Sequence, residues 1–294
     1  MLIFSAVCSF SCSNAQVRDT DKGFHLPEVP ATLILPEDRA AHLSLHYWDH
    51  FDFKNKDLID TPDIAEQAYV DFLSILPYTD KAEEAVAELY KRAAVEKEML
   101  VYFMNLGDKY LYQPNSPMHN EDYHIMQLRA VIASPALDEH EKLRPRYMLE
   151  TALKNRPGDI AADFGFSLRG GGRQKLSEIE ADCLLIYFND PDCDDCRRVK
   201  DLLASSSVIN EHLSSGKLKI LSVCVEGKSE AWENATFPTG WIDACDENKL
   251  LTEEQIYDLK AMPTLYLLDK SKRVLLKDAP PERIEDRLIS HQLP

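Results

Sequence analysis

Two cysteines in the stretch "DPDCDDCRRVK", residues 190–200, have the spacing of a redox pair. Cys193 and Cys196 follow the apolar run "CLLIYF", so we expect them where a buried strand turns into a helix. The free N–H groups and the positive dipole end of a helix stabilise a thiolate, which makes the first cysteine a nucleophile. Cys196 could then attack a mixed disulfide formed at Cys193, and the pattern therefore indicates thiol–disulfide exchange.

The spacing of the pair also allows two other uses. A structural zinc site needs four ligands, but the chain has no second Cys-x-x-Cys, and the nearest other cysteines, Cys183, Cys224 and Cys245, are scattered. Cys183 and Cys224 read as small core residues, whereas Cys245 is expected to be more exposed. A purely structural disulfide stays open as an alternative, although so small a loop stabilises little through loop-closure entropy.

Carboxylates surround the pair at Asp192, Asp194 and Asp195. Acids in the first turn compete with a thiolate for the helix dipole, so we expect them to modulate Cys193 and to give a reducing couple, nearer thioredoxin than DsbA. Arg197 and Arg198 would partly offset this effect. The alternative is that the acids are simply good helix-start residues on a solvated face.

The elements around the pair alternate between strand and helix from residue 157 onward. Strands are expected at 183–188 and 218–226, and "MPTLYLLD" and "RVLLK" read as a hairpin. Helices are expected around 193–205, 207–214 and 252–261, and at the C-terminus. This alternation predicts an α/β domain with a central mixed sheet flanked by helices.

The preceding half follows a different pattern. Residues 36–155 show apolar positions at helical spacing, with the longest candidate at 80–112, bent or broken near Gly107. We therefore expect an all-α helical domain at 27–156, followed by the α/β domain at 157–294.

The second half resembles the thioredoxin fold, in the exported variety related to thiol–disulfide oxidoreductases of the TlpA and AhpC/TSA superfamily of Bacteroidota. The resemblance is carried by "PGDIAADFGFSL", "LLIYFNDPDCDDC" and "YDLKAMPTLYLLDKSKRVLLK". The first half, from "RAAHLSLHYWDHFDF" onward, resembles a helical domain of unknown function that precedes such thioredoxin domains in the same bacteria.

The resemblance implies that Pro263 follows a cis peptide bond and that the backbone of Met262 binds an extended substrate next to the cysteines. Three departures from the family pattern stand out. Asp192 occupies the usual place of a tryptophan, and Asp190 replaces the Thr or Ser that a peroxidase of this superfamily needs. Tyr187 stands where thioredoxin has a buried acid.

Composition excludes some partners. The formal net charge of −17 repels nucleic acid and anionic surfaces, so no nucleic-acid partner is expected. His42, His46 and His50 share one predicted helix, but such stripes are more often packing than ligands, and we predict no metal and no cofactor.

Residues 1–16, "MLIFSAVCSFSCSNAQ", have the apolar run and small residues of an export segment, although no Lys or Arg precedes the run. Cleavage at Ala15–Gln16 and lipid attachment at Cys12 both stay open. A periplasmic or envelope location is therefore expected, with membrane attachment by an N-terminal lipid as one form of it.

Together these observations predict an exported thiol–disulfide oxidoreductase that acts on protein substrates and is served by an envelope reductant. Cys193 would attack and Cys196 would resolve, while Met262 and Pro263 would orient the substrate. The alternative is a non-catalytic binding module on the thioredoxin scaffold, with a structural disulfide.

Overall fold

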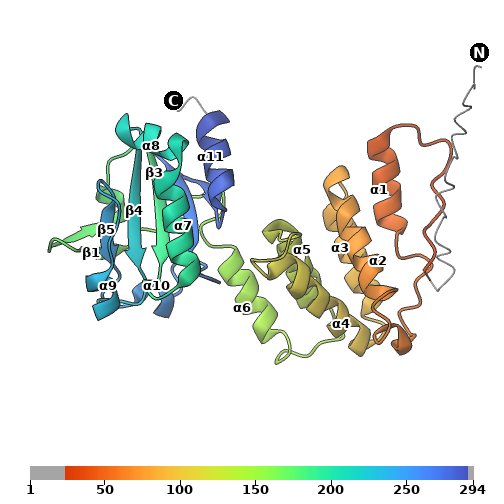
Figure 1. The fold of residues 1–294 in the computed structure, drawn as a ribbon. Coiled ribbons are helices and arrows are strands. Elements are labelled where there is room, and N and C mark those ends of the chain that lie inside the picture. Colours follow the sequence, from red (N-terminus) through yellow and green to blue (C-terminus); the bar gives the residue numbers. More distant parts are fainter. Residues whose placement is uncertain (1–23, 291–294) are drawn as a thin grey trace, which may run out of the picture. The chain divides into compact units, whose positions relative to one another are not determined.

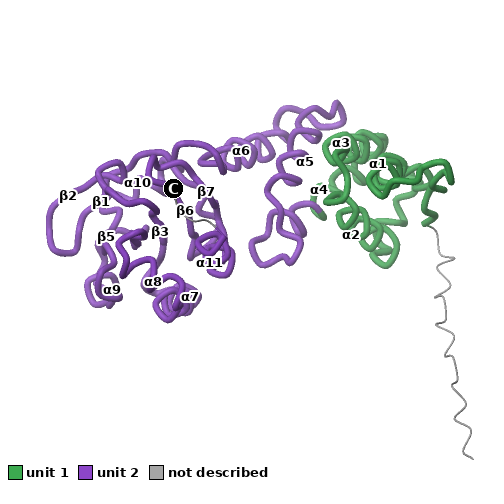
Figure 2. Tube along the Cα trace, turned by 90° about the horizontal axis from the view of Figure 1, so that it is seen from above, with its two compact units in different colours: residues 1–106 green, residues 107–294 purple. Residues whose placement is uncertain are grey.

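The structure, a computed structural model, describes residues 24–290. The chain forms two compact units, Met1–Leu106 and Gly107–Pro294 (Figure 2). The export segment predicted at 1–16 lies outside the described residues, and the domain limits 27–156 and 157–294 stay a prediction. Among the described residues, no helix combines the length and apolarity that crossing a bilayer requires.

The first unit is built from helices around an aromatic core. Trp48 packs edge-on against Phe51 and Phe103, with ring centroids 5.4 and 5.2 Å apart. The helices are α1 (Pro36–His46), α2 (Ala65–Ile75), α3 (Ala82–Ala93) and α4 (Lys97–Gly107), with short 3-10 turns at Lys56–Leu58 and Leu76–Tyr78.

The long helix predicted at 80–112 is in fact two helices and a π-helical turn, Asp108–Tyr112. The chain leaves the helix after Ala93, and this break lets the buried Tyr90 hydroxyl donate to the Phe103 carbonyl at 3.1 Å. Gly107 is required where α4 ends, because a Cβ there would collide with the side chain of Gln127.

The second unit contains a mixed sheet with strand order β2-β1-β5-β4-β3-β6-β7. Figure 1 labels β1, β5, β4 and β3 of this sheet. The strands are β1 (Gly165–Leu168), β2 (Arg173–Lys175), β3 (Cys183–Asn189), β4 (Leu218–Cys224), β5 (Ile242–Cys245), β6 (Thr264–Asp269) and β7 (Val274–Lys277). The helices are α5 (Glu121–Ala133), α6 (Leu143–Ala152), α7 (Asp194–Ser205), α8 (Ser207–Ser214), α9 (Glu230–Asn234), α10 (Leu250–Glu253) and α11 (Pro281–Ser290), with a 3-10 turn at Leu176–Glu178. The predicted α/β organisation is confirmed.

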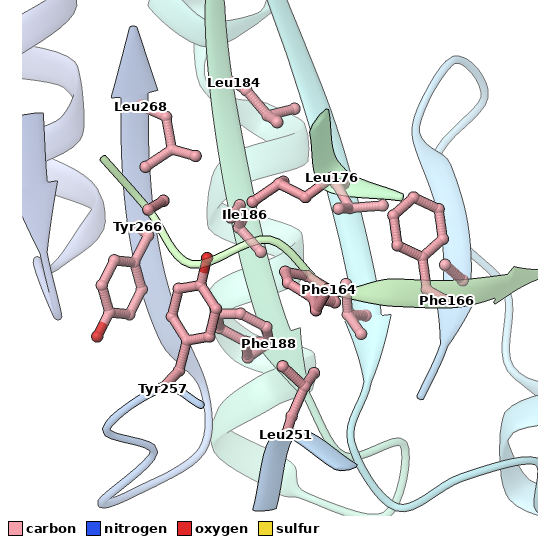
Figure 3. Packing of buried hydrophobic residues seen from close by; sticks show 14 of the residues in the cluster. Phe164, Phe166, Leu176, Leu184, Ile186, Phe188, Leu251, Tyr257, Tyr266 and Leu268 are labelled. Carbon is pink, nitrogen blue, oxygen red and sulfur yellow. The ribbon is translucent and has the colours of Figure 1, made fainter. Parts of the chain in front are cut away.

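Strand β3 is buried along its whole length because both faces of the sheet are covered. Successive side chains of a strand point to opposite faces. Leu185 and Tyr187 therefore pack under α7, α8 and α11, whereas Ile186 and Phe188 lie in the cluster on the other face, together with Phe164 and Tyr257 from two separate segments (Figure 3).

The strand directions decide which loops meet. β3 runs parallel to β4 and antiparallel to β6, with Phe188 opposite Thr264. The end of β3 and the start of β6 therefore lie at the same edge of the sheet. This brings the segments at 190–196 and 261–263 together, although they are far apart in the sequence.

The helix predicted at 252–261 is wrong beyond its first residues, since α10 ends at Glu253. Gln255 has a left-handed backbone, with φ of 50°, which ends the helix. Tertiary contacts then override the helical pattern. The Tyr257 hydroxyl donates to the Ala162 carbonyl at 2.7 Å, and Lys260 turns into a buried ion cluster.

Candidate functional site

Cys193 is the N-cap residue of α7. Its sulfur accepts a hydrogen bond from the backbone N–H of Cys196, with a sulfur–nitrogen distance of 3.1 Å. The preceding turn is closed by the N–H of Cys193 donating to the Asp190 carbonyl at 3.1 Å. Cys193 is only half-buried, so its sulfur can be reached. A helix N-terminus is the place where a developing thiolate is stabilised.

Cys196 is buried, with 2% of its surface exposed. Burial raises the pKa of this thiol, so it stays protonated while Cys193 faces solvent. Its sulfur accepts from the backbone N–H of Asp190 at 3.5 Å, and its carbonyl accepts from the Tyr187 hydroxyl at 2.7 Å. Burial also raises the pKa of Tyr187, which therefore acts as a neutral donor.

The Met262–Pro263 peptide bond is cis and immediately precedes β6. The thiol of Cys193 donates to the Met262 carbonyl with a sulfur–oxygen distance of 3.5 Å. The backbone of Met262 thus lies directly against the half-exposed cysteine. Since the partners of an extended peptide are backbone groups, this is where a bound substrate strand could pair.

The three acids around the pair are held on the surface. Asp194 is ion-paired with Arg197, and Asp195 with Arg198 at 3.0 Å, each three residues along α7. Their side chains are 91% and 68% exposed, so solvent screens both charges. The N–H of Asp192 donates to the Asp190 side chain at 3.0 Å and shapes the turn. This geometry favours the view that the acids act mainly as helix-start residues.

A hollow of about 300 Å³ opens beside Cys196. Its lining includes Tyr187 and Asn189 at the end of β3, and Arg197 and Lys200 of α7. Residues of α9 and of the segment up to Phe237 also line it. The hollow has room for one substrate side chain next to the disulfide-exchange position.

Arg169 fixes the wall that α9 contributes. Its guanidinium lies 4.5 Å from the ring centre of Trp232, pairs with Asp243, and donates to the Trp232 carbonyl at 2.6 Å. The indole N–H of Trp232 donates to the same Asp243 carboxylate at 3.1 Å. Sequence patterns do not reveal this arrangement, because Arg169, Trp232 and Asp243 come from three separate segments.

All five cysteines of the described part of the chain are free thiols. Cys183 and Cys224 are buried, as expected of small core residues. The expectation that Cys245 is exposed is wrong, because it is fully buried beside Cys224 on the neighbouring strand, under Trp232. Burial raises the pKa of Cys245 as well.

The prediction that His42, His46 and His50 share one helix is wrong for His50, because α1 ends at His46 and His50 lies in the turn that follows it. The rings of His42 and His46 stack with centres 4.4 Å apart, and His46 bonds to Asp49 at 2.8 Å. Across residues 24–290, no three His, Cys, Asp or Glu side chains are grouped as ligands of a metal ion.

The fold of the chain is shared with a solved relative. A solved structure of a thioredoxin-like protein from Bacteroides caccae is 42% identical in sequence, with a TM-score of 0.88. The match covers 92% of this chain and 99% of that one. The fold and the site thus define a thioredoxin-like protein, as the resemblance of the second half implied.

The N-terminal half identifies the family. Residues 8–155 match the model of a domain of unknown function, DUF5106. The chain therefore belongs to the DUF5106 family, in the form in which this domain is joined to a thioredoxin-like domain. The predicted combination of the two halves is confirmed.

Two further solved structures each cover less than half of this chain. The C-terminal domain of an uncharacterized protein from Bacteroides fragilis is 36% identical, covering 46% of this chain and 98% of its own, with a TM-score of 0.45. A thiol-disulfide oxidoreductase from Bacteroides fragilis is 23% identical, covering 45% of this chain and 98% of its own, with a TM-score of 0.40. No curated protein matches the chain.

Proposed function

We propose that this protein is an exported thiol–disulfide oxidoreductase that exchanges the Cys193–Cys196 dithiol with disulfides of protein substrates. One observation carries the proposal. The sulfur of Cys193 caps α7, is half-buried, and lies 3.5 Å from the Met262 carbonyl, while Cys196 is buried behind it. A nucleophile, a resolving thiol and a backbone docking edge are therefore together at one edge of the sheet.

The reaction divides into two exchanges. The Cys193 thiolate attacks one sulfur of the substrate disulfide, a mixed disulfide forms, and the other substrate sulfur leaves as a thiolate. Cys196 then loses its proton and attacks the Cys193 sulfur, which closes the Cys193–Cys196 disulfide and releases the substrate dithiol. The substrate gains two electrons and the pair loses two, and a dithiol reductant of the envelope restores the pair.

Met262 and Pro263 would orient the substrate, with the Met262 backbone pairing with an extended strand and the hollow beside Cys196 taking a neighbouring side chain. The peroxidase alternative is disfavoured because Asp190, and not Thr or Ser, stands three positions before Cys193. Its backbone N–H donates to Cys196, and its carbonyl closes the turn.

The proposed place of action is the periplasm or cell envelope. The mature N-terminus of the protein from its native host, read by mass spectrometry, should begin at Gln16 or at a lipid-modified Cys12. An intact Met1 in the cell would contradict export.

The function is tested by the reduction potential of the Cys193–Cys196 pair. The purified full chain is equilibrated with glutathione buffers and the free thiols are trapped. We expect a reversible two-electron couple between about −120 and −270 mV, the range of working oxidoreductases. The same protein should reduce the disulfides of insulin in the presence of dithiothreitol.

Two variants serve as controls. Cys193→Ser should abolish both the couple and insulin reduction, whereas Cys183→Ala, which removes a buried thiol at the other end of β3, should leave the couple in place. A pair that stays oxidised far below −300 mV would be a structural staple. The protein would then be a binding module on a thioredoxin-like scaffold.

A further inference from the structure

A cluster of buried charges joins the start of α5 to the thioredoxin-like sheet, inside the second unit. We call Glu121, Lys260 and Lys277 the Glu121 cluster. The Nζ atoms of Lys260 and Lys277 lie 3.3 and 3.0 Å from the same carboxylate oxygen, Oε1 of Glu121. The two lysine side chains are only 5% and 3% exposed. Two ammonium groups are thus held away from water around one carboxylate.

Each lysine also binds elsewhere. Lys277 donates to the carbonyls of Ala152 and Lys154 at 2.8 and 2.9 Å, and so closes the C-terminal end of α6. Lys260 lies 3.0 Å from the Asp258 carboxylate and 5.1 Å from the ring centre of Tyr112. The two lysines of the sheet domain therefore bind both helices, α5 through Glu121 and α6 through its last carbonyls.

Glu121 is the group that makes this arrangement stable. Buried like charges repel strongly, and a buried charge without a partner is costly. Arg156 is a further cation, 3.9 Å from the other oxygen of Glu121. Without the Glu121 carboxylate, Lys260 would keep Asp258 and Asp278 as acidic neighbours, but it would lose the one carboxylate oxygen that it shares with Lys277 and would be repelled by that second ammonium group. Lys260 would then be pushed from its place.

Lys260 lies two residues before Met262, the residue whose carbonyl accepts from Cys193. Between them, the Ala261 carbonyl accepts from the Thr264 hydroxyl at 2.7 Å. The loop 258–263 is therefore fixed on one side by the Glu121 cluster and on the other by the start of β6. A shift of Lys260 moves the Met262 backbone relative to Cys193.

We propose that Glu121 is a positioning residue for the redox site: by holding Lys260, it sets the Met262 backbone in the place where an extended peptide substrate pairs beside Cys193. The last two helices of the DUF5106 match, α5 and α6, thereby stabilise the loop that forms the substrate-binding edge. This inference rests on the proposed function and names a determinant of its substrate class, which is an extended polypeptide disulfide.

The test compares a polypeptide disulfide with a small one. Glu121→Gln keeps the shape of the side chain and removes its charge. We expect kcat/KM for insulin reduction to fall about tenfold or more, because backbone pairing at Met262 is disturbed. The rate of attack of reduced protein on the small disulfide dithiobis-nitrobenzoate should stay within about twofold, because that reaction needs only Cys193.

Matched variants keep the result specific. Asp122→Asn removes the next carboxylate of α5, which is 65% exposed and paired with Arg156, and should leave both rates unchanged. Glu121→Gln combined with Lys260→Gln removes both charges of the pair, and we expect a smaller combined loss than the sum of the single losses. Should Glu121→Gln unfold, Glu121→Asp keeps the charge with a shorter reach and should show a smaller loss of insulin reduction, again without a loss of reaction with the small disulfide.

The inference and the proposed function fail in different ways. If the unmodified protein reduces neither disulfide, the proposed function is wrong, and the loop is then tested directly by amide exchange. Faster exchange across 258–264 in Glu121→Gln supports the positioning role, and unchanged exchange refutes it. An equal loss of both rates, or no loss of insulin reduction, would also overturn the inference.

Discussion

Two groups of charged residues flank the redox site, and they differ in almost every physical respect. The acids and arginines of α7 are neighbours in the sequence, and their ion pairs lie in solvent, with the Asp194 side chain 91% exposed. The Glu121 cluster joins residues 139 positions apart, and its lysines are almost fully buried. Pairs of acidic and basic side chains thus occur next to Cys193 and next to Met262 in opposite environments.

The difference shows how burial, and not proximity in the sequence, sets the energy of a charge. An exposed ion pair contributes about 0 to 1 kcal/mol, because water and salt screen it. Breaking a buried pair costs about 3 to 5 kcal/mol, because the remaining charge has lost its partner and cannot reach water. We therefore expect substitutions in the Glu121 cluster to change stability, and those on α7 to change it little.

The largest effect is expected for Lys277→Met. The methionine fills a similar volume, but the Ala152 and Lys154 carbonyls lose their donor, and Glu121 loses one of its cations. We expect α6 and β7 to lose about 3 to 5 kcal/mol of protection, measured by amide exchange of the peptides that contain them.

Lys270→Met provides the matched control, because this lysine is 82% exposed and its ion pair with Asp182 spans 3.3 Å at the surface. We expect its effect to stay within about 0.5 kcal/mol. Similar losses of stability for Lys277→Met and Lys270→Met would contradict the expectation that a buried ion pair matters more than an exposed one.

A smaller effect of opposite sign is expected for Asp278→Asn. Burial raises the pKa of Asp278 above its ordinary value, although Lys260 and His119 oppose the shift. A carboxyl with a raised folded-state pKa binds its proton more tightly in the folded chain. Its contribution to stability is therefore complete below about pH 4 and is lost as the pH rises through the folded-state pKa.

The asparagine variant has no charge to bury. It should therefore melt a few degrees higher than the unmodified protein at pH 7, and this advantage should shrink as the pH falls toward 4. Asp278 has a left-handed backbone, with φ of 48°, which asparagine adopts readily, so any conformational gain is independent of pH. An advantage that does not vary with pH would show that the buried charge of Asp278 is not its cause.

The redox pair could be located from sequence because its geometry is local. A buried strand, a turn and a helix N-terminus follow one another from Cys183 to Ser205, and short-range rules describe each of them. The resemblance to the thioredoxin fold predicts that the Met262 backbone lies beside the cysteines. The antiparallel pairing of β3 with β6 explains this position. The roles of these residues in catalysis stay predictions.

The Glu121 cluster could not be located in the same way. "YDLKAMP" contains Asp258 and Lys260, and its pattern suggested a helix, because no local rule reports that Lys260 must turn inward to meet Glu121. The burial of Cys245 escapes local rules for a similar reason, since its polar neighbours in the sequence suggest exposure while its strand partner and Trp232 bury it. Long-range partners decided both positions.

The smallest effect is expected on α7. Asp194→Asn and Asp195→Asn remove a negative charge near the helix N-terminus, which favours the thiolate of Cys193 and makes the couple less reducing. Because surface pairs are worth at most about 1 kcal/mol, the shift in reduction potential should stay below about 20 mV.

Arg198→Gln removes the partner of Asp195 and should shift the potential in the opposite direction. All three shifts should fade in 1 M KCl, where the screening length is about 3 Å. Shifts that persist at high salt would mean that solvent does not screen the interaction of these carboxylates with Cys193. The contrast between exposed charges on α7 and buried charges in the Glu121 cluster would then be wrong.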